Sequence, residues 1–256
     1  MKIVVIGGTG LIGKPLVEQL RTEGNEVVAA SPSTGINSVT GEGLSAALAG
    51  TDVIVDIPNS PSFEDAAVLD FFERSTRNLV EEGKKAGVRH HVVLSIVGAD
   101  RTTNIGYMRA KVAQEKIVTE AGTPYTIVRA TQFFEFLPAL AEGGAKGDTI
   151  TLSPVLMQPI AAADVSAALA EVAVDIPTNG IVELAGPEPL RLADAARRVL
   201  EARGDNRTVV ADESVGYFGG AVTDDSLIPG KDPSITDQQF GPTHFDEWLH
   251  DSSASD

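Results

Sequence analysis

Short apolar runs alternate with longer amphipathic stretches through the first half of the chain, a pattern typical of alternating strands and helices. Mostly apolar runs predict strands at Ile3–Ile6, Glu26–Ala30, Asp52–Ile57, His91–Ile96 and Tyr125–Arg129. Apolar positions at helical spacing predict helices at Leu11–Leu20, Phe63–Ala86 and Ile105–Ala121. Strands that alternate with helices indicate an α/β fold, a doubly wound parallel sheet with helices on both faces.

The pattern loosens beyond about residue 130. Short strands are predicted at Thr149–Leu152, Met157–Ile160 and Ile181–Leu184, and helices at Ala162–Val174 and Leu192–Arg203. Proline and glycine become frequent over Gly216–Pro242, which predicts a loop-rich stretch. A long loop in a compact domain is usually a lid or a binding segment, so we expect this stretch to lie near a site.

A glycine-rich turn directly follows the first strand, in the segment KIVVIGGTGLIG. One glycine makes the tight turn, the next lets the backbone approach a pyrophosphate, and the third lets the helix pack on the strand. The phosphates bind the free N–H groups at the start of that helix. The motif therefore predicts dinucleotide binding by six positions of the turn: Gly7, Thr9, Gly10, Leu11, Ile12 and Gly13.

A candidate catalytic group follows the fourth predicted strand. Tyr107 and Lys111 are four residues apart on a predicted helix and share one face. Ser95 lies twelve residues before Tyr107, where the strand ends, and ligands bind such sheets at the C-terminal ends of the strands. The ammonium is expected to lower the pKa of the phenol, and the serine to bind a carbonyl oxygen. The spacing predicts a Ser–Tyr–Lys triad.

These motifs resemble the atypical short-chain dehydrogenases/reductases of the NmrA-like, NAD(P)H-binding branch. The resemblance covers nearly the whole chain and includes, besides the turn and the triad, Asp52, Thr126–Arg129, Gln158–Ile160 and Asp164–Val165. It implies a Rossmann fold, a nicotinamide cofactor and hydride transfer. It also implies that Tyr107 is the general acid, that Lys111 binds the nicotinamide ribose, and that Ser95 positions the carbonyl.

Phe72 departs from the family pattern. Alignment on Thr76–Leu79 places Phe72 where extended members often carry an asparagine in a proton relay, so we expect no relay through this side chain. Asn78 is expected to contact neighbouring backbone instead. Many NmrA-like relatives lack the tyrosine and act as redox sensors, so membership alone does not establish catalysis.

The end of the second strand bears on the choice of cofactor. NAD-dependent folds usually place a carboxylate there to bind the ribose 2′-OH, and this chain has none. Hydroxyl groups of Ser31, Ser33 and Thr34 stand in that loop, either as phosphate donors or only as turn formers. We expect NADP(H) to be preferred, with NAD(H) possible, and Ile57 and Asn59 to line the adenosine side.

The substrate side is predicted to include Gln132 and Phe133, after the fifth strand, and Tyr217. Tyr217 lies in the loop-rich stretch Gly216–Pro242, which we call the late loop. Phe245 and Trp248 are expected to fasten the C-terminal helix to the body. Glu135 is expected either to bind a polar group or to face solvent. Because no cluster of Lys and Arg marks a site for a phosphorylated substrate, we expect a small carbonyl, enone or quinone.

Composition narrows the class of protein. The net charge of −16 opposes binding to nucleic acid, and the absence of cysteine excludes disulfides and thiol catalysis. Four histidines show no metal spacing, and no apolar run is long enough to span a membrane. The first strand begins at once, so no signal segment is expected. We expect a cytoplasmic monomer or homodimer that binds a small-molecule substrate.

We therefore divide the chain into three parts. Residues 1–130 form a dinucleotide-binding Rossmann core, residues 131–250 a mixed C-terminal region on the substrate side that partly returns to the core, and residues 251–256 a disordered tail. The predicted function is NAD(P)H-dependent hydride transfer. The alternatives are a non-catalytic redox sensor and a sugar-nucleotide epimerase or dehydratase, although no basic residues suit a second pyrophosphate.

Overall fold

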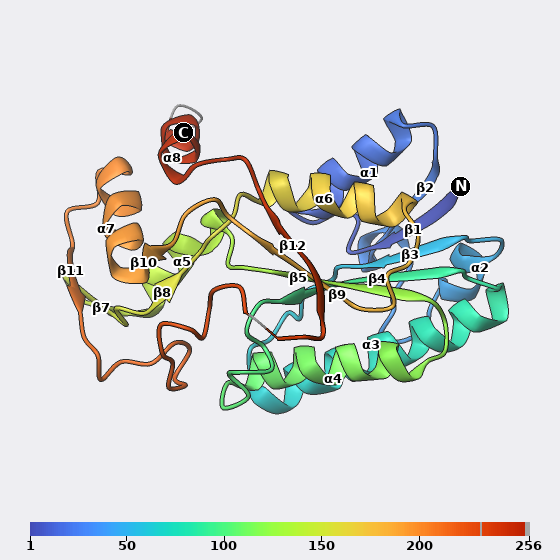
Figure 1. Ribbon diagram of the computed structural model, residues 1–256, viewed down its shortest axis with the longest axis horizontal. Helices are drawn as coiled ribbons and strands as arrows, with labels where there is room; N and C mark the ends of the chain where they lie inside the picture. The colour runs from blue at the N-terminus through green and yellow to red at the C-terminus, as the bar shows by residue number, and fades with distance from the viewer. Residues whose placement is uncertain (231, 254–256) are drawn as a thin grey trace.

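The computed structural model describes residues 1–230 and 232–253 and is built around a seven-stranded sheet (Figure 1). The strands lie in the order β12-β9-β5-β4-β3-β1-β2, and each neighbouring pair is parallel. They are β1 (Lys2–Ile6), β2 (Glu26–Ala30), β3 (Val53–Asp56), β4 (His90–Ile96), β5 (Tyr125–Ala130), β9 (Ile181–Ala185) and β12 (Ile235–Phe240). The predicted Rossmann-type α/β fold is confirmed.

Helices cover both faces of this sheet, as Figure 1 shows. Helices α1 (Gly13–Thr22) and α6 (Ala162–Val174) lie on one face, and α3 (Asp65–Ala86) and α4 (Gly106–Glu120) on the other. Alternate residues of β1 point to opposite faces, so Ile3 and Val5 pack in the α1–α6 core while Val4 and Ile6 pack toward α3. Two short elements follow β2, the single turn η1 (Pro32–Thr34) and α2 (Leu44–Leu48).

The C-terminal region adds a smaller lobe, at the left of Figure 1. It contains η2 (Phe134–Phe136), α5 (Leu137–Gly143), α7 (Leu192–Ala202), α8 (Phe245–Ser253), a β11–β7–β6 sheet and a β10–β8 pair. The short strands are β6 (Ala145–Lys146), β7 (Thr149–Leu152), β8 (Leu156–Met157), β10 (Leu190–Arg191) and β11 (Thr208–Ala211). Phe134 contacts Phe245 and Trp248, with ring centroids 5.3 Å apart in each pair, so these two residues fasten α8 as expected.

Three segments differ from the sequence-based expectation. β12 lies inside the stretch predicted to be loop-rich, because an exposed edge strand needs no apolar alternation and Thr236–Gln238 are exposed. The strand predicted at Met157–Ile160 ends at Met157, since Pro159 offers no N–H to a ladder. The expected tail is helical through Ser253, where α8 ends, and residues 254–256 lie outside the described residues.

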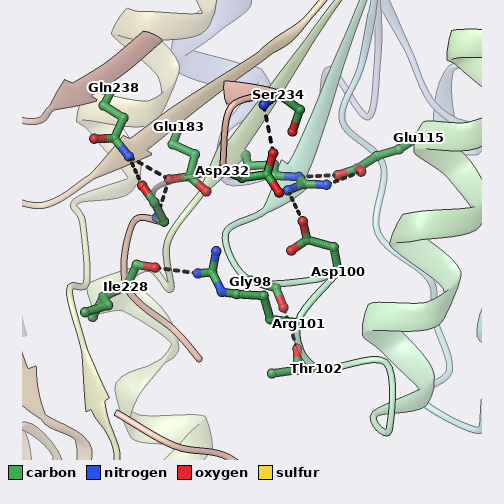
Figure 2. A network of polar contacts seen from close by, with 12 residues as sticks. Gly98, Asp100, Arg101, Thr102, Glu115, Glu183, Ile228, Asp232, Ser234 and Gln238 are labelled. Carbon is green, nitrogen blue, oxygen red and sulfur yellow. Dashed lines mark hydrogen bonds and ion pairs between the residues drawn. The ribbon is translucent and has the colours of Figure 1, made fainter. Parts of the chain in front are cut away.

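A buried arginine, Arg129, joins α4 to the sheet through Glu115 and also binds Asp100, two acceptors that Figure 2 labels. Arg129 on β5 is 4% exposed, and its guanidinium donates to both carboxylate oxygens of Glu115 on α4, at 2.9 and 2.7 Å. A third hydrogen bond, of 2.8 Å, runs from Arg129 to Asp100 in the loop after β4. Since α4 carries Tyr107 and Lys111, this ion pair helps to set where those side chains lie.

The same network fastens the loop that precedes β12. Glu183 on β9 stands opposite Arg129 in the strand register and accepts hydrogen bonds from the Gly230 N–H, at 2.7 Å, and from the Gln238 amide, at 3.1 Å. Arg101 donates to the Ile228 carbonyl at 2.6 Å (Figure 2). The C-terminal part of the late loop is therefore attached to the sheet.

Arg129→Met is expected to lower the free energy of unfolding by about 3–5 kcal/mol, because the buried Glu115 carboxylate loses its partner. Chemical denaturation measures this change. The control is Arg77→Met, which breaks an exposed pair with Glu73 and should cost little. Equal losses in the two variants would contradict this account of Arg129.

Candidate active site

The glycine-rich turn has the geometry that a pyrophosphate requires. Gly7 has a φ of +85°, which is costly for other residues, and a Cβ on Gly13 would lie 2.2 Å from the Gly7 carbonyl oxygen. A Cβ on Gly10 would meet only that oxygen, at 3.3 Å, and Gly10 is exposed. Within the described chain, no side chain caps the N-terminus of α1 and no acidic residue stands in its first turn. These residues fit a dinucleotide.

Gly8 is a position that the sequence reasoning missed. It is buried, and a Cβ there would come within 2.8 Å of the Ala29 Cα on β2. The doubled glycine after β1 therefore serves the packing of the turn against the neighbouring strand. The sequence contained a signal for this position, since Gly8 is an additional glycine directly after Gly7.

The hydroxyl groups after β2 are bonded within their own turn. The Ser31 and Ser33 hydroxyl oxygens are 2.8 Å apart, and the Thr34 hydroxyl accepts from the Ser31 N–H at 3.0 Å and donates to the Ala29 carbonyl at 3.1 Å. Ser31 is buried, whereas Ser33 and Thr34 are exposed. The turn is therefore already closed by its own hydrogen bonds at the end of β2, where the ribose 2′ position of a dinucleotide is expected.

Lys111 points from α4 toward the sheet. Its Nζ donates to the Leu94 carbonyl on β4 at 2.8 Å and to the Gln114 amide oxygen, and it lies 4.2 Å from the centroid of the Phe72 ring. The Gln114 amide nitrogen in turn donates to the carboxylate of Asp56 on β3 at 2.8 Å. A buried polar chain therefore leads from Lys111 to a carboxylate that is 0% exposed.

Burial lowers the pKa of Lys111 to about 8. The charges of Asp56 and Glu115 act in the opposite direction and favour the ammonium. The amine therefore titrates close to the physiological range.

Tyr107 donates its hydroxyl hydrogen to Asn59 Oδ1, at 2.7 Å. Its ring packs edge-on against Phe72, with centroids 5.7 Å apart. Burial raises the pKa of Tyr107 above its usual value, the opposite of the direction expected from the neighbouring ammonium. The phenol is therefore protonated at neutral pH and is a weaker acid than a tyrosine in water.

Ser95 is buried at the C-terminal end of β4, and its hydroxyl has no partner within the described residues. Across residues 1–230 and 232–253, no hydrogen bond joins Ser95, Tyr107 and Lys111 directly. Phe72 connects two of them through packing, since it contacts both the Tyr107 ring and the Lys111 ammonium. The functional role of the three residues stays a prediction.

The predicted substrate residues lie in different surroundings. Gln132 is buried, and its amide atoms have no partner in the part of the chain that the structure describes. The Phe133 ring stacks on the Phe136 ring, with centroids 5.5 Å apart. Tyr217 is 5% exposed. Glu135 binds the Ala162 N–H and the indole of Trp248, so it holds helices in place.

Asn59, in the loop after β3, is predicted to line the adenosine side of the cofactor. In the structure its side-chain oxygen accepts a hydrogen bond from the Tyr107 hydroxyl. Ile57 packs in the α1–α6 core with Leu94. Asn78 donates to the Ser38 carbonyl, at 2.8 Å, and so contacts backbone as expected.

A family model described as NAD(P)H-binding matches residues 7–175. The chain belongs to this NAD(P)H-binding family, and the resemblance to atypical short-chain dehydrogenases/reductases is confirmed. The matched range contains the glycine-rich turn, β4, α4 and β5, and therefore the elements described above.

Curated relatives match about half of the chain. The photosystem II assembly factor Ycf39 of Cyanophora paradoxa is 28% identical over 151 residues, 54% of this chain and 47% of that protein. Divinyl chlorophyllide a 8-vinyl-reductase of Cucumis sativus is 27% identical over 173 residues, 55% of this chain and 41% of that protein. The chain thus spans less than half the length of these relatives.

Solved structures share the fold over the whole chain. The structure of MoeE5 in complex with UDP-glucose and NAD has a TM-score of 0.73, at 15% identity, and the match covers 100% of this chain and 99% of that one.

Among the described residues, no helix has the length and apolar character needed to cross a membrane, and no group of His, Cys, Asp and Glu is arranged for a metal ion.

Gly10→Val is expected to abolish binding of nicotinamide cofactors while the fold survives. The side chain would occupy the open space above the turn, where a pyrophosphate approaches the backbone. Gly13→Ala is the contrasting variant, since its Cβ meets backbone and should lower the thermal midpoint. Titration calorimetry on the folded Gly10→Val protein gives the test, and wild-type affinity would contradict the assignment.

Lys111→Met is expected to change how stability depends on pH. The folded pKa of about 8 lies below the ordinary lysine pKa of 10.5, so the unfolded chain binds more protons between these values. Wild-type stability should therefore rise relative to the variant as pH increases from about 8 to about 10.5. Parallel unfolding free energies across this range, from urea titrations, would show that Lys111 is not perturbed.

Proposed function

We propose that the protein is an NAD(P)H-dependent reductase that transfers a hydride to a small carbonyl, enone or quinone. The observation that carries this proposal is the Tyr107 hydroxyl, a hydrogen-bond donor on α4 that lies 2.7 Å from Asn59 Oδ1 in the loop after β3. Reduction of a carbonyl needs such a donor, because the oxygen gains negative charge as the carbon receives the hydride. The name of the cucumber relative, a reductase, supports the same class of reaction.

The nicotinamide ring, when bound, supplies the hydride. Tyr107 gives its hydroxyl proton to the substrate oxygen, for which it leaves its hydrogen bond to Asn59. Ser95 offers an unpartnered hydroxyl that can donate to the same oxygen. Lys111, as the family resemblance implies, binds the nicotinamide ribose.

We further propose that NADP(H) is the preferred cofactor, with NAD(H) also accepted. β2 ends without a carboxylate, so nothing there repels a 2′-phosphate. The exposed Ser33 and Thr34 hydroxyls can donate to that phosphate once their turn rearranges.

A specific observation favours a second candidate, a cofactor-binding sensor without turnover. Tyr107 and Lys111 donate to Asn59 and to the Leu94 carbonyl rather than toward Ser95.

The decisive experiment follows NADPH and NADH consumption over a panel of carbonyls and quinones, with UDP-glucose included for sugar-nucleotide chemistry. Consumption supports the reductase. Cofactor binding with no consumption, together with a cofactor-dependent affinity for a protein partner, supports the sensor.

Tyr107→Phe is expected to lower turnover by about 10²-fold or more and to leave cofactor affinity nearly unchanged. The ring still packs against Phe72, and only the proton donor is lost. Tyr125→Phe, on β5, is the matched control and should retain wild-type turnover. Steady-state kinetics on a panel substrate provides the measurement, and full activity of Tyr107→Phe would remove Tyr107 from the mechanism.

Ser31→Asp is expected to reverse the cofactor preference from NADPH to NADH. A carboxylate at the end of β2 repels the 2′-phosphate and accepts a hydrogen bond from the ribose 2′-OH. Ser45→Asp, an exposed change on α2, serves as the charge-matched control. Dissociation constants for both cofactors decide the point, and tighter binding of NADH by the wild type would show that the preference is wrong.

A further inference from the structure

Two exposed aromatic rings face each other near the candidate site, and one of them lies beside Tyr107. Phe63, in the loop between β3 and α3, is 62% exposed, and Phe218, in the late loop, is 60% exposed. Their planes are within 12° of parallel and their centroids are 6.2 Å apart. The Phe63 centroid lies 5.7 Å from that of Tyr107. Two loops far apart in the sequence therefore present a pair of aromatic faces next to the candidate proton donor.

Phe218 adopts a backbone conformation that a phenylalanine rarely takes. Tyr217 and Gly220 exchange both backbone hydrogen bonds, at 2.9 and 3.0 Å, around a two-residue turn. Phe218 has a φ of +47° and Gly219 one of +78°, the pattern of a type I′ turn. Asn-Gly is the favoured sequence in such turns, and a bulky residue with positive φ is strained. Strained residues cluster at ligand sites, which motivates a functional explanation.

The turn is fixed to the start of α4, the helix that carries Tyr107. A Cβ on Gly220 would lie 2.4 Å from Ile105, and the Asn104 amide donates to the Ala221 carbonyl at 3.0 Å. On the other side, Asp65 at the start of α3 pairs with Arg109 of α4, which ties the Phe63 loop to the same helix. Both loops are therefore fastened to the helix that carries Tyr107, while the two rings stay exposed.

We propose that Phe63 and Phe218 form an aromatic clasp that binds a flat conjugated ring, so that the site accepts aromatic ketones and quinones in preference to aliphatic carbonyls. This inference rests on the proposed function, because the clasp is placed by its distance to Tyr107. The two ring centroids are 6.2 Å apart, which is less than two aromatic stacking distances, so the exposed Phe218 ring must turn outward before a planar ring can lie between them. Once there, the planar ring stacks on both phenyl faces and gains attraction beyond its buried area. A saturated ring of the same skeleton is too thick to stack and lacks the matching charge distribution.

Two probes with one carbonyl and one carbon skeleton test the clasp: 2-acetylnaphthalene, which is flat, and 2-acetyldecahydronaphthalene, which is not. Each is titrated calorimetrically into protein saturated with oxidised cofactor, which has no hydride to give. The flat probe is expected to bind about tenfold more tightly to the wild type. Phe63→Leu should reduce this preference to about threefold or less, whereas the control Phe240→Leu, an exposed residue of β12, should keep it.

Phe218→Asn separates ligand binding from stability. It creates the favoured turn sequence with Gly219, so the thermal midpoint is expected to stay the same or rise while the preference for the flat probe falls. A lower midpoint with an unchanged preference would overturn the clasp and leave a purely structural role. Equal affinities of the wild type for the two probes, or no binding of either up to its solubility limit, would also overturn it.

The failure of the clasp and the failure of the proposed function give different results. Because binding is measured without hydride, Tyr107→Phe should retain the preference for the flat probe. A retained preference in a protein that consumes no cofactor with any substrate supports the clasp and contradicts the reductase. Consumption of cofactor with equal affinities for the two probes supports the reductase and contradicts the clasp.

Discussion

The buried ion pair between Arg129 and Glu115 is the constraint on which the candidate site depends. A guanidinium removed from water must have its donors satisfied, and here Glu115 on helix α4 and Asp100 in the loop after β4 accept hydrogen bonds from Arg129. Helix α4 is consequently locked against β5 in one position. Tyr107 and Lys111 take their positions from that lock, and the late loop is attached to the same network through Glu183.

Phe72 explains why the two α4 side chains behave differently from the simple expectation. Its ring lies against both Tyr107 and Lys111, and it offers no hydrogen bond to either. The phenol therefore keeps its proton and turns to Asn59, and the ammonium turns to the Leu94 carbonyl and Gln114. An apolar residue at this position therefore removes water from both side chains without replacing the hydrogen bonds that the water would make.

Features set by neighbours in sequence were the ones that the sequence predicted well. The turn at Gly7–Gly13 and the shared face of Tyr107 and Lys111 follow from local geometry, and the fold follows from the alternation of apolar runs. Asn59 and Phe63 were not recognised as neighbours of Tyr107, because the contacts of loops have no period and arise only after the strands are ordered. The pKa direction of Tyr107 was missed for the same reason, since burial depends on Phe72 and on the late loop.

β12 completes the main sheet although it is the last strand of the chain. During synthesis on a ribosome, β1 to β5 and then β9 emerge well before it, and domains begin to fold from the N-terminus. Until β12 arrives, β9 is an open edge, and Glu183 lacks the hydrogen bonds that its Oε2 accepts from Gly230 and Gln238 in the folded structure. A nascent or truncated chain therefore exposes an unpaired edge strand with an uncompensated carboxylate, and the last strand acts as the cover that ends this vulnerable stage.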